Sequence, residues 1–435
     1  MTIKQKVIKA IQELERRTIE REELIRLVIV AIFSKKHMFL YGERGVGKSY
    51  IIRLLGNLIE QSKYWELQVG IDTEAKQLFG VKKVSENGTI YYDANNTILD
   101  AHLAFLDEMF KAKSEVLNTL LQVMVDRYYT TGDSRMIPVP LISMIGASNE
   151  YPSGSLAAPY LDRLTLWYDV TRITEKENRL RFFNGDFDKS LIQEPLFTLD
   201  DIETVYKASK NVIVPREILE TFTKIVDQYI LRGVKTSDRK YAHLIEVMKV
   251  SAVINERDQI DYSELFYFLY GAWHNDVEKR MVEEDLYNIL FSNKENIDAI
   301  LEKVEKAIEK WDSIKNGQLF DFLNYKAEFY TQDSQQEFEK LIGYVNSLLQ
   351  RYYEEFNELV AIKERKAFVD MVERQIENNM LLPNFKNRTF NEENLNKLLS
   401  LETELENRIA KTSEWLKENQ TLIDYKRNQH SAGSM

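Results

Sequence analysis

The sequence predicts an α/β fold with a parallel sheet, followed by a region made only of helices. Between residues 37 and 170, short apolar runs alternate with amphipathic stretches, which is typical of parallel strands joined by helical crossovers. A glycine-rich turn at residues 42–49 joins the first apolar run to a helical stretch. From about residue 275 onward, apolar residues recur only at helical or heptad spacing, so no strand is expected there.

The elements follow in order along the chain. Residues 1–36 have the apolar period of helices, and a helical block is expected from Thr198 to about His274. The expected strands are Met38–Tyr41, Tyr64–Val69, Leu103–Leu106, Leu141–Ala147 and Leu166–Val170. Beyond them, long antiparallel helices should form a rod or bundle. We therefore expect an αβα core at 1–190, an all-helical domain at 191–275 and a C-terminal helical domain at 276–435.

Composition narrows the class of protein. A chain of 435 residues has room for two or three domains. It has no cysteine and only five histidines, with no close histidine pair, which excludes disulfides and thiolate metal sites and disfavours a zinc centre. The net charge of −11 disfavours a broad nucleic-acid surface but leaves a local basic channel open. No apolar run reaches membrane-spanning length and no signal peptide is indicated, so a cytoplasmic location is expected.

The glycine-rich turn predicts a phosphate-binding loop. It has the form GxxxxGKS and consists of Gly42, Glu43, Arg44, Gly45, Val46, Gly47, Lys48 and Ser49, followed by Tyr50 at the start of the helix. Backbone N–H groups of such a loop surround phosphate oxygens, and the helix N-terminus adds a favourable dipole. Lys48 would neutralise the β- and γ-phosphates of ATP, and the Ser49 hydroxyl would bind Mg²⁺. The alternative is an ordinary turn that contains Lys-Ser by chance.

Polar residues at the ends of two later strands complete this prediction. Asp107 and Glu108 follow four apolar residues; Asp107 would hold Mg²⁺ through its waters, and Glu108 would act as general base on the attacking water. Asn149 follows the strand at 141–148 and would orient that water. Taken alone, the acidic pair fits a strand end that meets solvent better than a catalytic site, and an isolated Asn is more often a turn former.

Two arginines are candidates for contact with the phosphates. Arg163, in the run Leu161–Leu164, suits an arginine finger that acts on the nucleotide of a neighbouring subunit. The alternative is an ordinary Asp–Arg surface pair. Arg239 lies in the first turn of a helix that Ser237 or Asp238 would cap, and it would reach the phosphates from the helical block. The alternative is a solvated basic residue.

These motifs, in this order, resemble the MoxR group of AAA+ ATPases, and within it the RavA (regulatory ATPase variant A) type. The matching segments are the loop at 42–49, Walker B at 105–112, sensor 1 at 147–150, the finger segment at 160–163 and sensor 2 at 237–240. The resemblance implies an αβα core with a helical lid, a homo-oligomeric ring of six subunits and MgATP bound between them. It also implies a von Willebrand A-domain partner and chaperone-like remodelling of proteins, with a hairpin at 127–140 and an element near the pore at 71–98.

The sequence departs from the family in two places. Glu43 and Arg44 replace the prolines common in the glycine loop, which should not abolish binding because backbone groups make the phosphate cradle. RavA carries a β-rich module within its helical C-terminal domain, but here only residues 313–334 could hold it, and that segment is too short. Two other functions stay open: a ring motor on nucleic acid, for which Lys76, Lys82 and Lys83 are weak support, and a scaffold whose assembly ATP controls.

Overall fold

A computed structural model describes residues 1–86, 90–152, 158–190, 192–291, 294–313, 332–383 and 392–432. The chain divides into two compact units. The first consists of residues 1–286 and 373–385, and the second of residues 287–372 and 386–435. The first unit therefore extends past the boundary expected at residue 276 and takes in a short segment from far along the chain.

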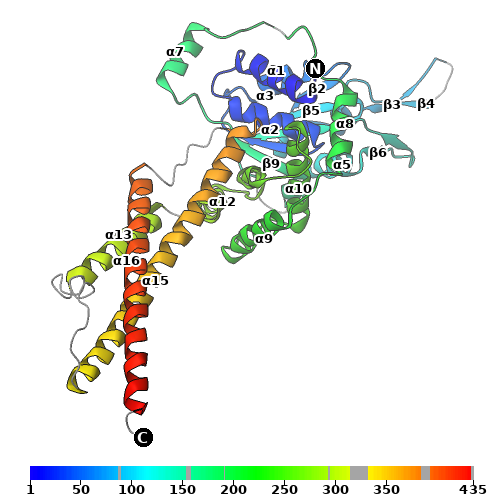
Figure 1. Cartoon of the computed structure of the whole chain (residues 1–435). Coiled ribbons are helices and arrows are strands. Elements are labelled where there is room, and N and C mark those ends of the chain that lie inside the picture. The colour runs from blue at the N-terminus through cyan, green and yellow to red at the C-terminus, as the bar shows by residue number, and fades with distance from the viewer. Residues whose placement is uncertain are drawn as a thin grey trace. The chain divides into compact units, whose positions relative to one another are not determined.

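The αβα core lies in the first unit (Figure 1). Its strands are β1 (His37–Tyr41), β2 (Tyr64–Gln68), β3 (Val81–Val84), β4 (Ile90–Asp93), β5 (Leu103–Asp107), β6 (Tyr128–Thr130), β7 (Met136–Pro138), β8 (Ser143–Ser148) and β9 (Leu164–Asp169). Its helices are α1 (Ile3–Glu15), α2 (Glu22–Phe33), α3 (Lys48–Gly56), α4 (Ala75–Phe79), α5 (Ser114–Asp126), α6 (Ala158–Arg163) and α7 (Lys176–Asn184), with 3₁₀ turns η1 (Ile98–Asp100) and η2 (Met109–Lys111).

Five parallel strands form the main sheet in the order β2-β5-β8-β1-β9. The side chains of β1 and β5 are almost fully buried, as expected for strands covered by helices on both faces. After β1 the chain continues to β2 at one edge of the sheet, and after β8 it continues to β9 at the other edge. Ligands of open α/β sheets bind at such a reversal, beside the carboxyl ends of the strands. The five strands expected from the sequence are the strands of this sheet, with ends that differ by up to two residues.

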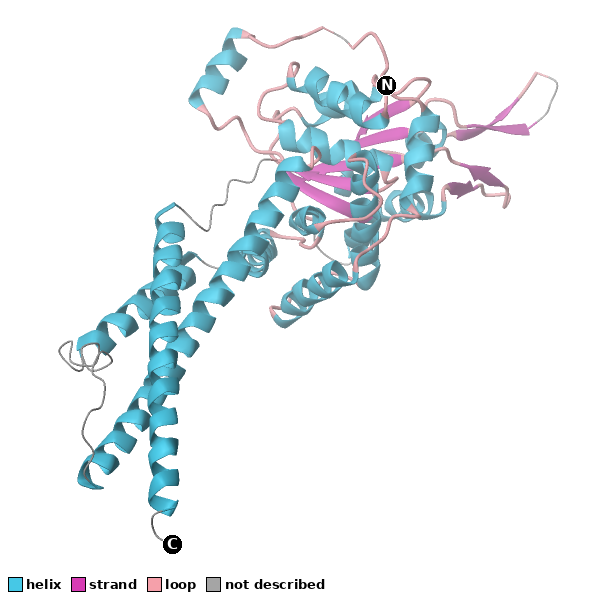
Figure 2. Ribbon diagram, viewed as in Figure 1, coloured by secondary structure: helices cyan, strands magenta, loops and turns pink. Residues whose placement is uncertain are grey.

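Two antiparallel pairs lie beside the main sheet (Figure 2). The β6–β7 pair is the hairpin expected at 127–140, and Thr131 N–H closes its turn by donating to Arg135 O (2.8 Å). The β3–β4 pair occupies the segment expected to carry a pore element. Of the two turns expected there, Gly80 precedes β3, while the one at Asn87 and Gly88 lies outside the described residues.

The remaining helices of the first unit form an all-helical lid. They are α8 (Leu199–Ser209), α9 (Arg216–Leu231), α10 (Asp238–Ile254), η3 (Tyr262–Tyr267), α11 (Phe268–Gly271) and the first part of α12 (Asp276–Phe291). Ser237 caps α10 by accepting from Lys240 N–H (3.2 Å). Tyr229 of α9 donates to Val282 O (3.0 Å), which ties α12 into the lid.

The second unit is helical throughout its described residues. It contains the end of α12, α13 (Lys294–Ser313), most of α15 (Gln332–Asn378) and α16 (Glu392–Ala432). The three long helices share one apolar core, formed by Leu301, Val304, Ile308, Leu348, Tyr352, Leu359, Ile362, Leu398, Leu401 and Leu405. Burial of these stripes stabilises the helices, since isolated helices gain little in water. Lys363–Glu402 and Arg408–Tyr352 contacts show that α15 and α16 run antiparallel, as expected.

Residues 314–331, the segment with room for an inserted module, lie outside the described residues. In the part of the chain that the structure describes, no helix combines the length and apolarity needed to cross a bilayer.

Candidate nucleotide-binding site

The glycine-rich loop connects β1 to α3, as predicted from its sequence. Gly47 precedes α3 with φ +86°, in the left-handed region that glycine adopts without strain. Gly42 lies so close to the chain after β9 that a Cβ there would be 2.5 Å from Val170 O. The Gly42 N–H donates to Ser148 O (3.1 Å) at the end of β8. The loop therefore lies at the carboxyl edge of the sheet, above β1 and β8.

Lys48 is buried at the start of α3 and points back into the loop. Its ammonium group donates to Gly42 O (2.6 Å) and Glu43 O (3.0 Å). Burial lowers the pKa of Lys48, while the charges of Asp107 and Glu108 oppose that effect. A buried ammonium held mainly by carbonyl oxygens is well suited to an anionic ligand, because phosphate would supply the counter-charge that the backbone lacks.

The two predicted acidic residues lie where β5 ends. Asp107 is its last residue, and its carboxylate accepts from Glu108 N–H (3.1 Å). Glu108 has φ +55°, a left-handed backbone conformation that is uncommon outside glycine. Such strained conformations concentrate at functional sites. Here the conformation turns the chain sharply at the sheet edge and leaves the Glu108 side chain almost fully buried.

Two cations hold the Glu108 carboxylate. Arg44 of the glycine loop donates through Nε to Oε1 (3.0 Å), and Lys111 Nζ lies 3.3 Å from Oε2. Burial favours the protonated form of Glu108, but Arg44 and Lys111 outweigh it and hold the pKa of this carboxyl below its usual value. Glu108 is therefore ionised at neutral pH, as a general base must be. Arg44 therefore connects this carboxylate directly to the glycine-rich loop.

Asn149 follows β8, between the strands that carry the loop and the acidic pair. Its side-chain Oδ1 is buried and has no hydrogen-bond partner among the described residues. An unpartnered buried amide oxygen is rare in folded proteins and usually marks the place of a water or ligand. The sheet order β5-β8-β1 thus places the loop, the acidic pair and Asn149 at the ends of three neighbouring strands.

The two predicted arginines are not joined to this cluster. Arg163 ends α6, where its Nη1 donates to Pro159 O (2.7 Å) and its buried Nε has no partner within the described structure. Arg239 is exposed in the first turn of α10 and forms no hydrogen bond or ion pair with any residue described. Ser49 and Tyr50, the two other predicted contacts, lie in the first turn of α3. The roles of Arg163 and Arg239 stay predictions.

Three residues before α2 take part in the site, and the sequence analysis missed them. Arg21 is buried and donates to Val46 O (3.0 Å) in the loop and Thr171 O (2.9 Å) after β9. Glu20 accepts from the backbone N–H groups of Thr174 (2.7 Å) and Glu175 (2.9 Å). Arg17 donates to Ser190 O (3.0 Å). These bonds pair residues far apart in sequence, so no local spacing signals them.

A cavity of about 780 Å³ lies beside the loop. The glycine loop and the segment before α2 line one side, and the segment around α7 lines the other. That segment contributes Phe182, Phe183 and Phe187, and α7 itself has no buried residue. The cavity is adjacent to the phosphate-binding loop, is large enough for a small ligand and is lined mainly by apolar and aromatic groups.

These residues fit a magnesium-bound nucleotide. A loop with a buried lysine can hold phosphates, and the aromatic cavity beside it can hold a base. Mg²⁺ typically keeps waters and phosphate oxygens and takes only one or two protein ligands, so Ser49 and Asp107 are sufficient as its protein contacts. Among the described residues, no cluster of three or more His, Asp or Glu side chains would hold a metal by itself.

Comparison with known proteins shows which domains this chain resembles. Residues 5–185 match the MoxR domain of MoxR–vWA–β-propeller ternary systems, and residues 217–286 match an AAA lid domain.

Several relatives are similar over part or most of the chain. Two uncharacterized proteins of Methanocaldococcus jannaschii are 28% and 26% identical, over 70% and 85% of this chain and 83% and 94% of their own length. Chaperone MoxR1 of Mycobacterium tuberculosis is 25% identical over 30% of this chain and 34% of its own. A solved structure from Cytophaga hutchinsonii, described as a candidate ATPase, has a TM-score of 0.55 at 17% identity, covering 67% and 95% of the two chains.

Proposed function

We propose that this chain, a MoxR-group AAA+ ATPase, binds ATP with Mg²⁺ and hydrolyses it at the interfaces between subunits of a ring. The observation that carries the proposal is the convergence of three neighbouring strand ends. β1 leads into the loop with buried Lys48, β8 ends at Asn149 with its unpartnered oxygen, and β5 ends at Asp107 and Glu108. Each group has the chemistry that phosphoryl transfer to water requires.

In this proposal the residues have separate tasks. Lys48 and the loop N–H groups bind the phosphates, and Ser49 and Asp107 hold Mg²⁺, which supplies charge neutralisation at the phosphates. Glu108 accepts a proton from the attacking water, and Asn149 positions that water. Because Arg44 contacts the Glu108 carboxylate, the same loop that binds phosphate also restrains the general base.

The finger belongs to a neighbouring subunit in this proposal. Arg163 lies at the end of α6 without a bond to its own loop among the described residues, and its buried Nε lacks a partner. In a ring, expected to be a hexamer, Arg163 would contact a neighbouring nucleotide through its Nη groups rather than through the buried Nε. Arg239 would reach the phosphates from the lid when the lid closes.

The work done by hydrolysis would be remodelling of a protein, through a von Willebrand A-domain partner. The support is the matching family, whose description names MoxR–vWA–β-propeller systems, and the chaperone relative. We retain the RavA type as the proposed branch within the group, with the second unit as the arm that docks a partner or client.

The alternative of a nucleic-acid motor loses its sequence support. Lys76, Lys82 and Lys83 were its candidate contacts, and each pairs with a carboxylate: Glu74 (2.5 Å), Asp133 (3.4 Å) and Asp93 (2.5 Å) respectively. Paired lysines contribute little net positive potential for binding phosphate backbones.

Nucleotide binding by variants tests the proposal. Lys48→Ala should abolish binding of a fluorescent ATP analogue in a folded protein, because the main counter-charge to the phosphates is lost. Lys224→Ala is the matched control, since Lys224 is an exposed lysine on lid helix α9. Equal affinity of the two variants would refute the assignment of the loop.

A further inference from the structure

The end of α15 belongs to the first unit, although the rest of the helix belongs to the second. Residues 373–385 lie in the first unit, and residues 287–372 lie in the second. The chain leaves the first unit within α12, after Leu286, and returns within α15, after Val372. At these two of the three crossings the chain is continuous helix, while the third, after residue 385, falls outside the described residues. A helix transmits displacement along its length better than a flexible linker does.

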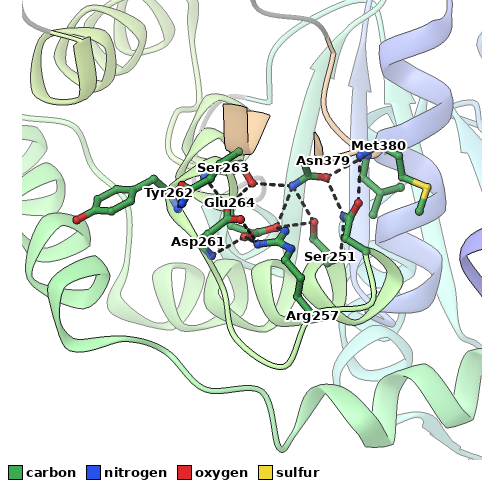
Figure 3. Close-up of polar contacts among 11 residues, drawn as sticks. Ser251, Arg257, Asp261, Tyr262, Ser263, Glu264, Asn379 and Met380 are labelled. Atoms are coloured by element: carbon green, nitrogen blue, oxygen red, sulfur yellow. Dashed lines mark hydrogen bonds and ion pairs between the residues drawn. The ribbon is translucent and has the colours of Figure 1, made fainter. Parts of the chain in front are cut away.

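Asn379, directly after α15, is inserted in a buried polar network of the lid (Figure 3). Its amide nitrogen donates to Ser263 Oγ (3.0 Å) and Glu264 Oε1 (2.9 Å), and lies 3.4 Å from Ser251 Oγ. Its amide oxygen accepts from Asn255 Nδ2 (2.9 Å). One side chain from residue 379 therefore joins the end of α10 to η3.

The network centres on a fully buried carboxylate. Glu264 accepts from Arg257 Nη1 (3.0 Å), Ser251 Oγ (3.0 Å) and Asp261 N–H (2.9 Å), in addition to Asn379. Burial raises the pKa of Glu264 to about 7, against the opposing charge of Arg257. A buried carboxylate is strongly disfavoured when it loses hydrogen-bond donors. The lid thus relies on a donor that the C-terminal part of the chain supplies.

Backbone and apolar contacts extend this attachment to the core. Met380 N–H donates to Asn255 Oδ1 (3.1 Å), while Met380 O accepts from Arg26 Nε (3.1 Å) on α2. Helix α2 leads directly into β1 and the glycine-rich loop. Leu381 and Leu382 are buried beside these bonds. Residues 373–383, which we name the return segment, therefore contact both the lid and the helix that precedes the phosphate-binding strand.

We propose that the return segment couples the C-terminal helices to the lid, with Asn379 as the positioning residue, so that nucleotide binding and the state of the helical arm influence each other. This proposal rests on the proposed function where it invokes nucleotide. A purely structural role would stabilise the lid without carrying any response to nucleotide into α15.

Hydrogen exchange on the full chain separates these roles. In the wild type, adding a non-hydrolysable ATP analogue with Mg²⁺ should slow exchange in the lid and change it in α15 at residues 342–372. Asn379→Ala should bind the analogue within about threefold of wild type, since it touches no phosphate-binding group. It should keep the lid response and lose the α15 response. Asn378→Ala is the matched control, because Asn378 is the exposed neighbour of the same type.

Several results would overturn the proposal. One is an α15 response that persists in Asn379→Ala, and another is the absence of that response in a wild type that binds the analogue. If the wild type binds no nucleotide, the proposed function fails. The coupling is then tested by comparing hydrogen exchange of the variants in the absence of nucleotide. Asn379→Ala should then raise exchange both in the lid at residues 244–255 and in α15 at residues 342–372, by at least about tenfold over Asn378→Ala, the scale for losing buried hydrogen bonds. A rise confined to the lid would leave the return segment a structural role only. Equal rates would refute the coupling.

A milder variant guards against misfolding of Asn379→Ala. Ser263→Ala removes one hydroxyl partner of Asn379 and leaves its bonds to Asn255 and Glu264. It should weaken the α15 response in the same direction. A wild-type response in a folded Ser263→Ala protein, together with failure of Asn379→Ala to fold, would assign the return segment a structural role only.

Discussion

Replacing Gly42 with alanine tests whether the phosphate-binding loop lies as close to β9 as the structure shows. The new Cβ would be 2.5 Å from Val170 O and 3.3 Å from Val170 C, where ordinary contact begins at 3.4 Å. The obstacle is backbone, and it is fixed by the bond from Val170 N–H to Tyr41 O (2.7 Å). If Gly42 moves away, its hydrogen bond to Ser148 O is lost, and if Val170 moves away, its hydrogen bond to Tyr41 O is lost.

The expected cost follows from that geometry. Forcing extra volume into a packed site costs about 1–3 kcal/mol, which for a unit of this size lowers Tm by roughly 2–5 °C. Nucleotide affinity should fall as well, because the displaced backbone carries the phosphate-binding N–H groups. Thermal unfolding and titration with a fluorescent ATP analogue would measure the two effects.

Two other glycines provide graded controls. Gly45→Ala meets no atom within 4 Å but has φ +81°, so only a left-handed backbone cost of about 1–2 kcal/mol is expected. Gly132→Ala, in the turn of the β6–β7 hairpin, also meets no atom and has no positive φ, so it should behave as wild type. If Gly42→Ala matches Gly132→Ala in both Tm and affinity, the close approach to β9 is wrong.

Two further predictions concern catalysis. Arg44→Ala removes a cation that lowers the pKa of Glu108, so the acidic limb of the kcat/KM profile should move to higher pH. Arg172→Ala breaks a different ion pair of the loop and should leave that limb in place. Measuring kcat/KM against pH for both variants and the wild type tests this prediction. Arg163→Ala and Lys48→Ala subunits, each inactive alone, should partly restore ATPase activity when mixed, because one interface then has an intact loop and an intact finger. Mixed rings shown to form but inactive at every ratio would argue against a finger acting between subunits.

Much of the site could be predicted because its signals are local. The loop at 42–49 contains its own glycines and lysine, and the acidic pair directly follows an apolar strand, so short windows of sequence identify both. Their proximity follows from the strand order, since parallel strands end at one edge of a sheet. The unpartnered Asn149 oxygen is a structural finding, but its place at a strand end was predicted.

The missed features depend on contacts between distant segments. Arg21 holds the loop through two backbone carbonyls, and any residue type can supply a carbonyl, so no motif marks the pairing. Asn379 lies more than 100 residues from its partners Ser263 and Glu264. Its position after a helix favours a cap or turn, and only the folded chain shows that it completes a buried network.

The contact between Arg44 and Glu108 also could not be predicted from the sequence. Glu43 and Arg44 were recognised as unusual residues of the loop, but their sequence gives no reason to expect an ion pair with Glu108, 64 residues later. In the structure, one of these two unusual loop residues contacts the proposed general base, Glu108.

The central claim is that Glu108 activates water for attack on a nucleotide held by the loop. Its most direct test is single-turnover hydrolysis of radiolabelled ATP with Mg²⁺ by wild type and Glu108→Gln, with bound ATP measured in the same samples. We expect the variant to retain ATP but to hydrolyse it at least about 100-fold more slowly, the scale for losing a general base. Hydrolysis at the wild-type rate by Glu108→Gln with ATP fully bound would contradict it.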